Sequence, residues 1–255
     1  MKDQINRTRN ALAHYFKEII YGGIDGIVTT FAVVAGFSGA ALANDVTVQV
    51  SFVVVLLFGL ANLFADAASM GLGNFLSVRS EKDLYHAKRA EVIAMIEQEP
   101  TAVYKEAEAV LVGKGFAAAD AATLVTIYAS NQMYLVDFIL QHQLELADPR
   151  GEQEVFTGLA TFFSFMVFGA IPLLPFIIQS EGDARTTFFF SAAGTFAALV
   201  TLGLLKWRVI GTRFWPSLLE VVLVGGVAAV LAFYVGSFFS VESASITVNL
   251  YPLLV

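Results

Sequence analysis

The sequence contains no cysteine and few charged residues, and both absences restrict what the protein can be. Without cysteine there is no disulfide framework, no thiolate metal site and no cysteine nucleophile. A bound metal ion would need oxygen, imidazole or thioether ligands. Charged residues make up 15% of the 255 residues and hydrophobic residues 57%, whereas a soluble domain carries about a quarter charged residues. This composition, with a mean hydropathy of +0.70, indicates a membrane protein.

Several function classes lack their usual motifs. The sequence has no Gly-rich phosphate loop, no His-Glu-x-x-His metal motif and no recognisable Ser/His/Asp arrangement. We therefore expect no enzyme, no coupling to ATP and no permanently bound cofactor. Basic residues form no extended patch, so we expect no nucleic-acid partner. Residues 1–20 are polar and mixed in charge, which predicts that there is no cleavable signal peptide.

Five apolar stretches are long enough to cross a bilayer, which takes about 20 residues. In lipid such stretches become helices, because each must satisfy its own backbone groups. We predict an all-α, polytopic membrane protein whose five transmembrane helices cover residues 21–43, 48–77, 155–178, 186–205 and 216–239. Pro172 and Pro175 predict a kink in the third span, where freed carbonyls either line a cavity or serve helix packing.

A polar segment separates the second span from the third. Residues 79–154 hold 13 acidic residues against 7 lysines and arginines. Helical patterns cover residues 80–99, 101–113 and 118–146, with Pro100 and Gly115 between them. We predict an inserted cytosolic three-helix domain at 79–154, between membrane segments at 1–78 and 155–255.

The basic residues of the loops predict the orientation. Lysines and arginines concentrate before the first span and between the fourth and fifth, at Lys2, Arg7, Arg9, Lys17, Lys206, Arg208 and Arg213. Because such residues favour the cytosolic side, we predict a cytosolic N-terminus and a cytosolic inserted domain. The missing targeting peptide and the compact length favour a bacterial inner membrane over a vacuolar membrane.

Ionisable groups within spans are expensive and usually functional. Two carboxylates, Asp25 and Asp66, are clear cases, whereas Glu220 at the start of the fifth span is interpreted as interfacial and structural. On the second span Asn62, Asp66, Met70 and Asn74 recur every four residues, so they share one helix face. A carboxylate one turn from a thioether and flanked by amides is a plausible face for a divalent transition metal. We place Asp25 near the cytosolic end of span one, in one layer with Asp66 and Met70.

Each of these residues also has a structural interpretation. Met70 could fill space in the core, and Asn62 and Asn74 could bridge helices by hydrogen bonds. Asp25 could cap a helix or lie at the membrane surface beside Lys17. The two aspartates and the polar stripe together favour a cation path.

Small residues also share one face of the first span. They are Gly22, Gly26, Gly36 and Ala40. Such a face lets another helix approach closely, so we predict that it contributes to a dimer interface.

Two segments carry a resemblance to a known family. YGGIDGIVTTFAVVAG (residues 21–36) and ADAASMGLGNFLS (residues 65–77) resemble the signature segments of the vacuolar iron transporters, which include the yeast vacuolar iron carrier and nodulin-like relatives. The resemblance covers nearly the whole chain. It implies a five-span homodimer that exports Fe²⁺ or Mn²⁺ from the cytosol in exchange for protons. It also implies that Asp25, Glu18 and Met70 line the path, and Asp66 lies in the matching motif.

The inserted domain departs from the family pattern. The resemblance implies metal-binding glutamates there, and Glu81 and Glu106 stand at such positions. However, Ile139 and Leu140 occupy the place of a methionine pair, and Gln143 that of a further glutamate. His86 and His142 are alternative ligands, although both are better interpreted as surface histidines. We therefore expect a weakened metal-loading site.

The leading hypothesis is a proton-coupled carrier in which Asp25 and Asp66 bind metal and protons in competition. Met70 would favour Fe²⁺ or Mn²⁺ over Mg²⁺ and Ca²⁺. The alternative is a non-transporting, membrane-anchored metal sensor or buffer that uses the inserted domain. A third possibility is transport of a different solute.

Overall fold

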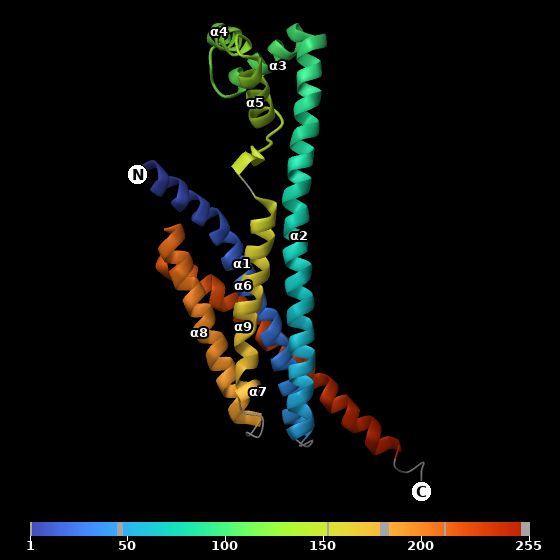
Figure 1. The fold of residues 1–255 in the computed structure, drawn as a ribbon. Coiled ribbons are helices and arrows are strands. Elements are labelled where there is room, and N and C mark those ends of the chain that lie inside the picture. Colours follow the sequence, from blue (N-terminus) through green and yellow to red (C-terminus); the bar gives the residue numbers. More distant parts are fainter. Residues whose placement is uncertain (1, 45–47, 152, 179–183, 212, 251–255) are drawn as a thin grey trace. The chain divides into compact units, whose positions relative to one another are not determined.

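The computed structural model describes residues 2–44, 48–151, 153–178, 184–211 and 213–250. All regular structure within them is helical (Figure 1). The chain divides into two compact units, which we call the membrane unit (residues 1–74 and 155–255) and the inserted unit (residues 75–154). α2 (Val48–Gln98) contributes residues to both, because no proline interrupts its 51 residues.

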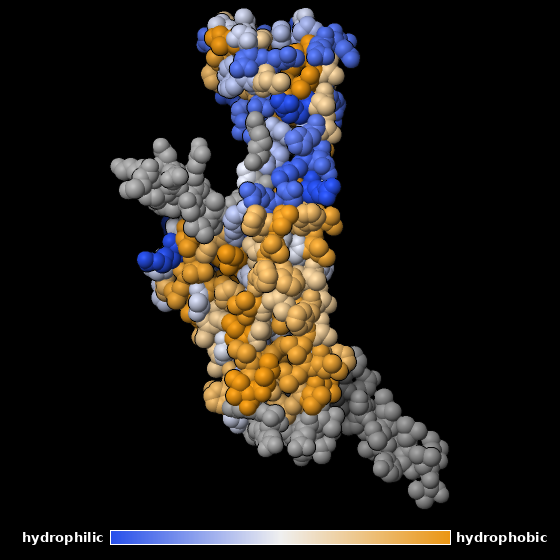
Figure 2. Space-filling model, viewed as in Figure 1, coloured by the Kyte–Doolittle hydropathy of each residue, from blue (hydrophilic) through white to orange (hydrophobic). Residues whose placement is uncertain are grey.

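The prediction of five spans in an all-α protein is confirmed. The helices that hold them are α1 (Lys2–Asn44), α2, α6 (Glu154–Gly169) with α7 (Leu174–Ile178), α8 (Ala184–Ile210) and α9 (Phe214–Leu250). Their stretches with the length and hydropathy to cross a membrane are Tyr15–Gly39, Phe52–Gln98, Glu154–Ile178, Arg185–Val209 and Phe214–Phe238. Figure 2 shows an almost continuous hydrophobic surface over the visible face of the membrane unit, as contact with lipid requires.

Within the residues whose side chains the structure describes, the helix that holds the first span covers Tyr15–Gly39. Asp25 lies within this stretch, and its depth in the membrane stays a prediction. Glu18 also falls inside this stretch, although the sequence interpretation counted Asp25 and Asp66 as the clear carboxylates within spans.

The third span is interrupted where the prolines predict a kink. α6 ends at Gly169, a 3₁₀ turn covers Ile171–Leu173, and α7 begins at Leu174. Proline cannot donate a backbone hydrogen bond, so a carbonyl is freed nearby. The Ser191 hydroxyl of α8 donates to the carbonyl oxygen of Pro172 at 2.7 Å. This hydrogen bond joins the third span to α8 at the kink, and the two predicted roles of the freed carbonyls stay open.

α1 is the central helix of the membrane unit. Phe31 and Val34 belong to an apolar cluster that also holds Leu63 of α2 and Phe165 of α6. Ile27 belongs to a second cluster, formed with residues of α8 and α9. Half of the α1 span is buried, compared with 11% of the α9 span. The other membrane helices therefore pack around α1.

Glycines allow α1 and α6 to approach closely. A Cβ atom on Gly22 would lie 2.9 Å from the carbonyl oxygen of Thr161, and one on Gly26 would lie 2.6 Å from that of Phe165. Gly36 faces α9, where a Cβ would lie 3.6 Å from the Ala232 carbonyl oxygen. These glycines make contacts within the chain, and a role of this face in a dimer stays a prediction. Ala40 lies outside the residues whose side chains the structure describes.

Helical segments of the inserted unit enclose one apolar core. They are the end of α2, α3 (Pro100–Gly113), α4 (Ala118–Ala129) and α5 (Gln132–His142), followed by a 3₁₀ turn at Pro149–Gly151. Pro100 stands in the first turn of α3, where its missing N–H costs nothing. Val92, Ala107, Val125 and Leu135 supply one buried core residue from each of the four helical segments.

The predicted single helix over residues 118–146 is wrong. The chain turns at Ser130 and Asn131, and α5 ends at His142. The Asn131 side chain caps α5 by accepting a hydrogen bond from the Tyr134 amide at 3.3 Å. The unit therefore contains four helical segments instead of three.

The glycine contacts predict a position-specific effect of added volume. Gly26→Ala should lower the melting temperature in detergent, because the new Cβ meets the rigid backbone of Phe165. Overpacking of this kind costs about 1–3 kcal/mol. Gly226→Ala in α9 is the matched control, since a Cβ there meets nothing within 4 Å. Equal melting temperatures for the two variants would contradict the close α1–α6 contact.

Candidate functional site

Polar side chains of the membrane unit gather where α1, α2 and α6 meet. Close backbone packing holds this junction together. A Cβ on Gly71 of α2 would lie 3.0 Å from the carbonyl oxygen of Gly158, and one on Gly169 of α6 would lie 2.9 Å from that of Gly26. Polar groups on the three helices are thereby brought within contact distance in an apolar setting.

A hydrogen bond fixes the register of α1 against α2. The Asn74 amide nitrogen lies 2.5 Å from Oε2 of Glu18. The two helices run in opposite directions (Figure 1). Moving seven residues forward along α1, from Glu18 to Asp25, therefore corresponds to moving seven residues back along α2, from Asn74 to residue 67. Asp25 is then level with residue 67, beside Asp66. The charges of Asp25 and Asp66 interact accordingly, and the structure places them in one layer.

Asp25 and Asp66 differ in their hydrogen bonding. The Asn62 amide donates to Oδ2 of Asp66 at 2.8 Å. In the part of the chain that the structure describes, no side chain donates to the Asp25 carboxylate; Thr29 donates instead to the Asp25 backbone carbonyl at 2.8 Å. Both aspartates are partly buried. We call Asp25, Asp66 and Asn62 the aspartate level.

A second set of polar side chains lies further along the same helices. Asn74 of α2 contacts both Glu18 of α1 and Thr161 of α6, the latter at 2.8 Å. Thr161 Oγ1 lies 3.3 Å from Oε2 of Glu18. We call these three residues the glutamate level. Met70 lies one helical turn from both Asp66 and Asn74 and packs against the apolar core of the junction.

This arrangement suits a divalent cation. Two carboxylates in one layer of an apolar span repel each other unless a cation or protons neutralise them. Carboxylate and amide oxygens suit hard and intermediate ions, and a thioether adds a preference for softer transition metals. The predicted residues Asp25, Asp66, Asn62 and Glu18 line this junction, with Met70 between the two levels.

Sequence reasoning missed the contribution of α6. Thr161 was assigned no role, and the path was assigned to the first two spans alone. One signal was available: Thr157, Thr161 and Ser164 recur at helical spacing within an apolar span. All three are buried in the structure, and the Ser164 hydroxyl donates to the carbonyl of Ile19 at 2.5 Å.

The glutamates predicted as ligands in the inserted unit lie in different cavities. Glu81 lines one of about 250 Å³, together with Glu145 and Asp148. Glu106 lines another of about 60 Å³, together with Glu91, Met95 and Ile139. The structure therefore does not bring Glu81 and Glu106 into one cavity. Among the described residues, no group of three or more histidines and carboxylates is placed to hold a metal ion.

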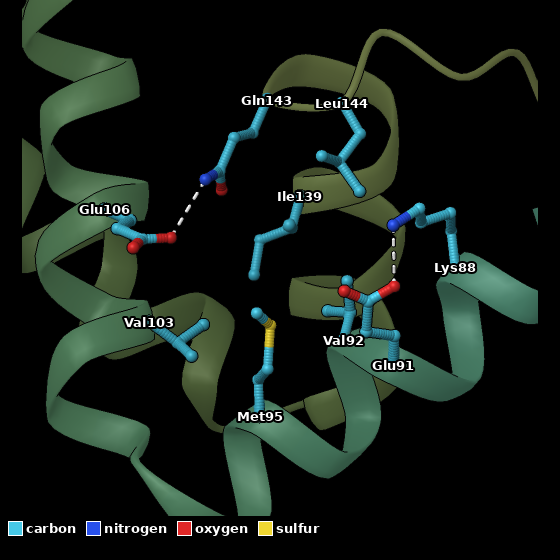
Figure 3. A pocket seen from close by; sticks show the side chains of 9 residues that line it. All are labelled: Lys88, Glu91, Val92, Met95, Val103, Glu106, Ile139, Gln143 and Leu144. Carbon is cyan, nitrogen blue, oxygen red and sulfur yellow. Dashed lines mark hydrogen bonds and ion pairs between the residues drawn. The ribbon is translucent and has the colours of Figure 1, made fainter.

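The carboxylates of the smaller cavity already have partners (Figure 3). The Gln143 amide donates to Glu106 at 2.9 Å, and the Lys88 ammonium pairs with Glu91 at 2.7 Å. Figure 3 shows Ile139 and Met95 pointing toward each other between the two carboxylates. A lysine and a glutamine thus occupy the positions around the glutamates. This cavity gives no support to the alternative of a metal sensor or buffer.

The two histidines of this unit lie beside aromatic rings. The His142 ring is 4.9 Å from that of Phe138, and the His86 ring is 6.0 Å from that of Tyr85. His142 and His86 do not line either cavity.

Comparison with known proteins gives the family. A model of the VIT family matches residues 16–237. The chain belongs to the vacuolar iron transporter family. Vacuolar iron transporters similar to it include one from Toxoplasma gondii, which is 33% identical over 89% of this chain and 75% of its own length. Another, from Plasmodium falciparum, is 29% identical over 92% of this chain and 85% of its own length.

Plants also carry related vacuolar iron transporters. Vacuolar iron transporter 1 of Oryza sativa is 29% identical to this chain, covering 85% of it and 82% of its own length. The family model spans every residue of the aspartate and glutamate levels. The junction of α1, α2 and α6 therefore lies within the part shared with vacuolar iron transporters.

A charge change in the smaller cavity should create a response to metal ions. Gln143→Glu would place a second carboxylate beside Glu106, so the repulsion should lower the melting temperature and Mn²⁺ should restore it. The parent should show no comparable shift from this cavity. Gln141→Glu, at an exposed position of α5, is the matched control. A metal-dependent shift of equal size in parent and Gln143→Glu would show that the cavity already binds metal.

Proposed function

We propose that the protein is a carrier that exports a divalent transition metal, Fe²⁺ or Mn²⁺, from the cytosol in exchange for protons. The proposal depends mainly on Asp25 and Asp66, which lie level with each other in the membrane unit. The Met70 thioether stands one helical turn from Asp66. The names of the related proteins support iron as the cargo. The missing ATP-binding motifs support a proton gradient as the driving force.

Charge balance supports proton exchange at the aspartate level. Two carboxylates carry two negative charges, which one divalent cation or two protons neutralise equally. Either occupant spares the site the cost of an uncompensated charge in an apolar span. Metal and protons then bind in competition at Asp25 and Asp66. The Asn62 amide holds one oxygen of Asp66 and leaves the other available.

Selectivity among divalent ions is assigned to Met70. Mg²⁺ and Ca²⁺ prefer shells made entirely of oxygen, whereas Fe²⁺ and Mn²⁺ accept softer ligands more readily. Met70 is partly buried, packs against the apolar core of the junction and stands one helical turn from each polar level, and on this position we assign its thioether to the ion path.

The loop charges support a cytosolic N-terminus and a cytosolic inserted unit. Metal would then enter the path from the side on which cells hold their free transition-metal ions.

An exposed face of α2 supports a homodimer. Its residues are small and recur every four positions at Ala61, Ala65, Ser69 and Gly73, and all four are exposed in the single chain. A Cβ on Gly73 would meet nothing within 4 Å. Small residues let a second helix approach closely in the membrane. This face adjoins Asp66 and Met70 on the same helix, so a second copy would seat beside the cation path.

Removal of the Asp25 carboxylate should abolish transport. In liposomes that contain a metal-sensitive dye, the parent should take up Fe²⁺ or Mn²⁺ under a pH gradient, and Asp25→Ala should reduce the initial rate at least about 100-fold. Glu220→Gln is the control, because that carboxylate is exposed and pairs with Lys206 at 2.6 Å. Full flux through folded Asp25→Ala would refute the assignment.

A bulky residue on the small-residue face should break the dimer. Gly73→Leu should yield a monomer by light scattering in detergent, because the side chain fills the space needed by the second helix. Gly226→Leu, at another open helical glycine, should leave the dimer intact. If both variants keep the mass of a dimer, the interface lies elsewhere.

A further inference from the structure

Two buried threonines of the membrane unit have hydroxyls with no hydrogen-bond partner in the part of the chain that the structure describes. They are Thr30 of α1 and Thr195 of α8, which are 0% and 4% exposed. On the same two helices, Thr29 and Thr201 each donate to a carbonyl one turn back at 2.8 Å. An unsatisfied buried hydroxyl is costly and rare, so the first two threonines need a further partner.

The contacts between α1 and α8 place these two threonines level with each other. A Cβ on Gly23 of α1 would lie 3.1 Å from the side chain of Leu202 of α8. Four residues further along α1, Ile27 shares a buried cluster with Ala198, which lies four residues back along α8. One threonine stands three residues beyond Ile27, and the other stands three residues before Ala198. Steps of three and four residues stay on one helix face, so the next contact in this series joins the two threonines.

This place adjoins the break in the third span. A Cβ on Gly194, the neighbour of Thr195, would lie 3.7 Å from the side chain of Ile171 in the 3₁₀ turn. Ser191, one turn earlier on α8, donates to the Pro172 carbonyl. Because proline has no N–H, Pro172 also leaves a carbonyl one turn back in α6 without its helical donor. Two unpartnered hydroxyls and a freed carbonyl therefore belong to the same region of the membrane unit.

The region is separate from the proposed cation path. Asp25 is two residues from both Gly23 and Ile27, so its side chain leaves α1 about 160° away from theirs. Asp25 interacts with the charge of Asp66 on α2, whereas the face with Gly23 and Ile27 packs against α8. The threonines offer neutral oxygen atoms, which would not compensate the charge of a buried ion. A small neutral ligand that both donates and accepts hydrogen bonds suits them best.

We propose that Thr30 and Thr195 bind one water molecule between α1 and α8, beside the break in the third span. Water can accept a hydrogen bond from one hydroxyl and donate to the other, or to the carbonyl that Pro172 frees. Buried waters typically make about three such bonds to polar groups that would otherwise lack a partner. The water thereby ties the broken third span to α1 and α8.

The test is a double-mutant cycle on thermal unfolding in detergent. Thr30→Val and Thr195→Val keep the shape of each side chain and remove its hydroxyl. Each should lower the melting temperature by about 4 °C, because the water loses a ligand and the other hydroxyl is left unpaired. The double variant should unfold within about 1 °C of the less stable single variant, since either substitution already removes the shared water.

A matched control and a direct observation complete the test. Thr201→Val removes a hydroxyl that bonds within α8, so its effect should add to that of Thr30→Val. A crystal structure of the parent, at a resolution that shows ordered water, should place density within hydrogen-bonding distance of both Thr30 and Thr195.

Three results would overturn the water site. Valine variants as stable as the parent, or more stable, would show that the hydroxyls bind nothing. Additive losses at Thr30 and Thr195 would assign each hydroxyl to a bond within its own helix. Ordered water elsewhere in the crystal, with none between these two threonines, would exclude the site even if a variant fails to fold.

Discussion

The membrane unit depends on the close contact of α1 and α6, which glycines make possible. Polar groups in an apolar span are costly unless other groups of the chain or an ion satisfy them. Because Gly22 and Gly26 bring the two backbones together, Thr161 reaches Glu18 and Asn74 at hydrogen-bonding distance. The same contact sets the depth of α1, and with it the level of Asp25 beside Asp66. The close contact of α1 and α6 therefore determines both the packing of these helices and the arrangement of the polar side chains between them.

The two units treat their carboxylates in opposite ways. In the inserted unit Glu91 is paired with the Lys88 ammonium, and Glu106 accepts a hydrogen bond from the Gln143 amide. In the membrane unit the carboxylate of Asp25 receives no hydrogen bond from any described side chain and faces the charge of Asp66. Water and salt screen the charges of exposed carboxylates in the inserted unit, whereas the apolar surroundings of a membrane span do not screen charges. An uncompensated carboxylate charge is therefore more costly in the membrane unit than in the inserted unit.

Hydropathy was enough to predict the spans, because a membrane helix must be apolar along its whole length. The break at Ser130 and Asn131 was missed because residues 116–148 contain neither glycine nor proline. The four-residue spacing on α2 was enough to select Asp66 and Met70. The spacing on α6 showed a polar face, but which helix it meets depends on tertiary packing that one sequence does not contain.

α2 links the cation path to assembly. One face carries Asn62, Asp66 and Met70 toward the junction, and the adjacent face exposes Ala65 and Ser69. Residues on neighbouring faces of one helix cannot move independently, so a partner helix seated on the second face constrains the first. Glycine and serine also let that partner lie close enough to cover the junction from lipid. The dimer proposed above would therefore do more than join two carriers, because each copy would close the side of the other's path that the single chain leaves open.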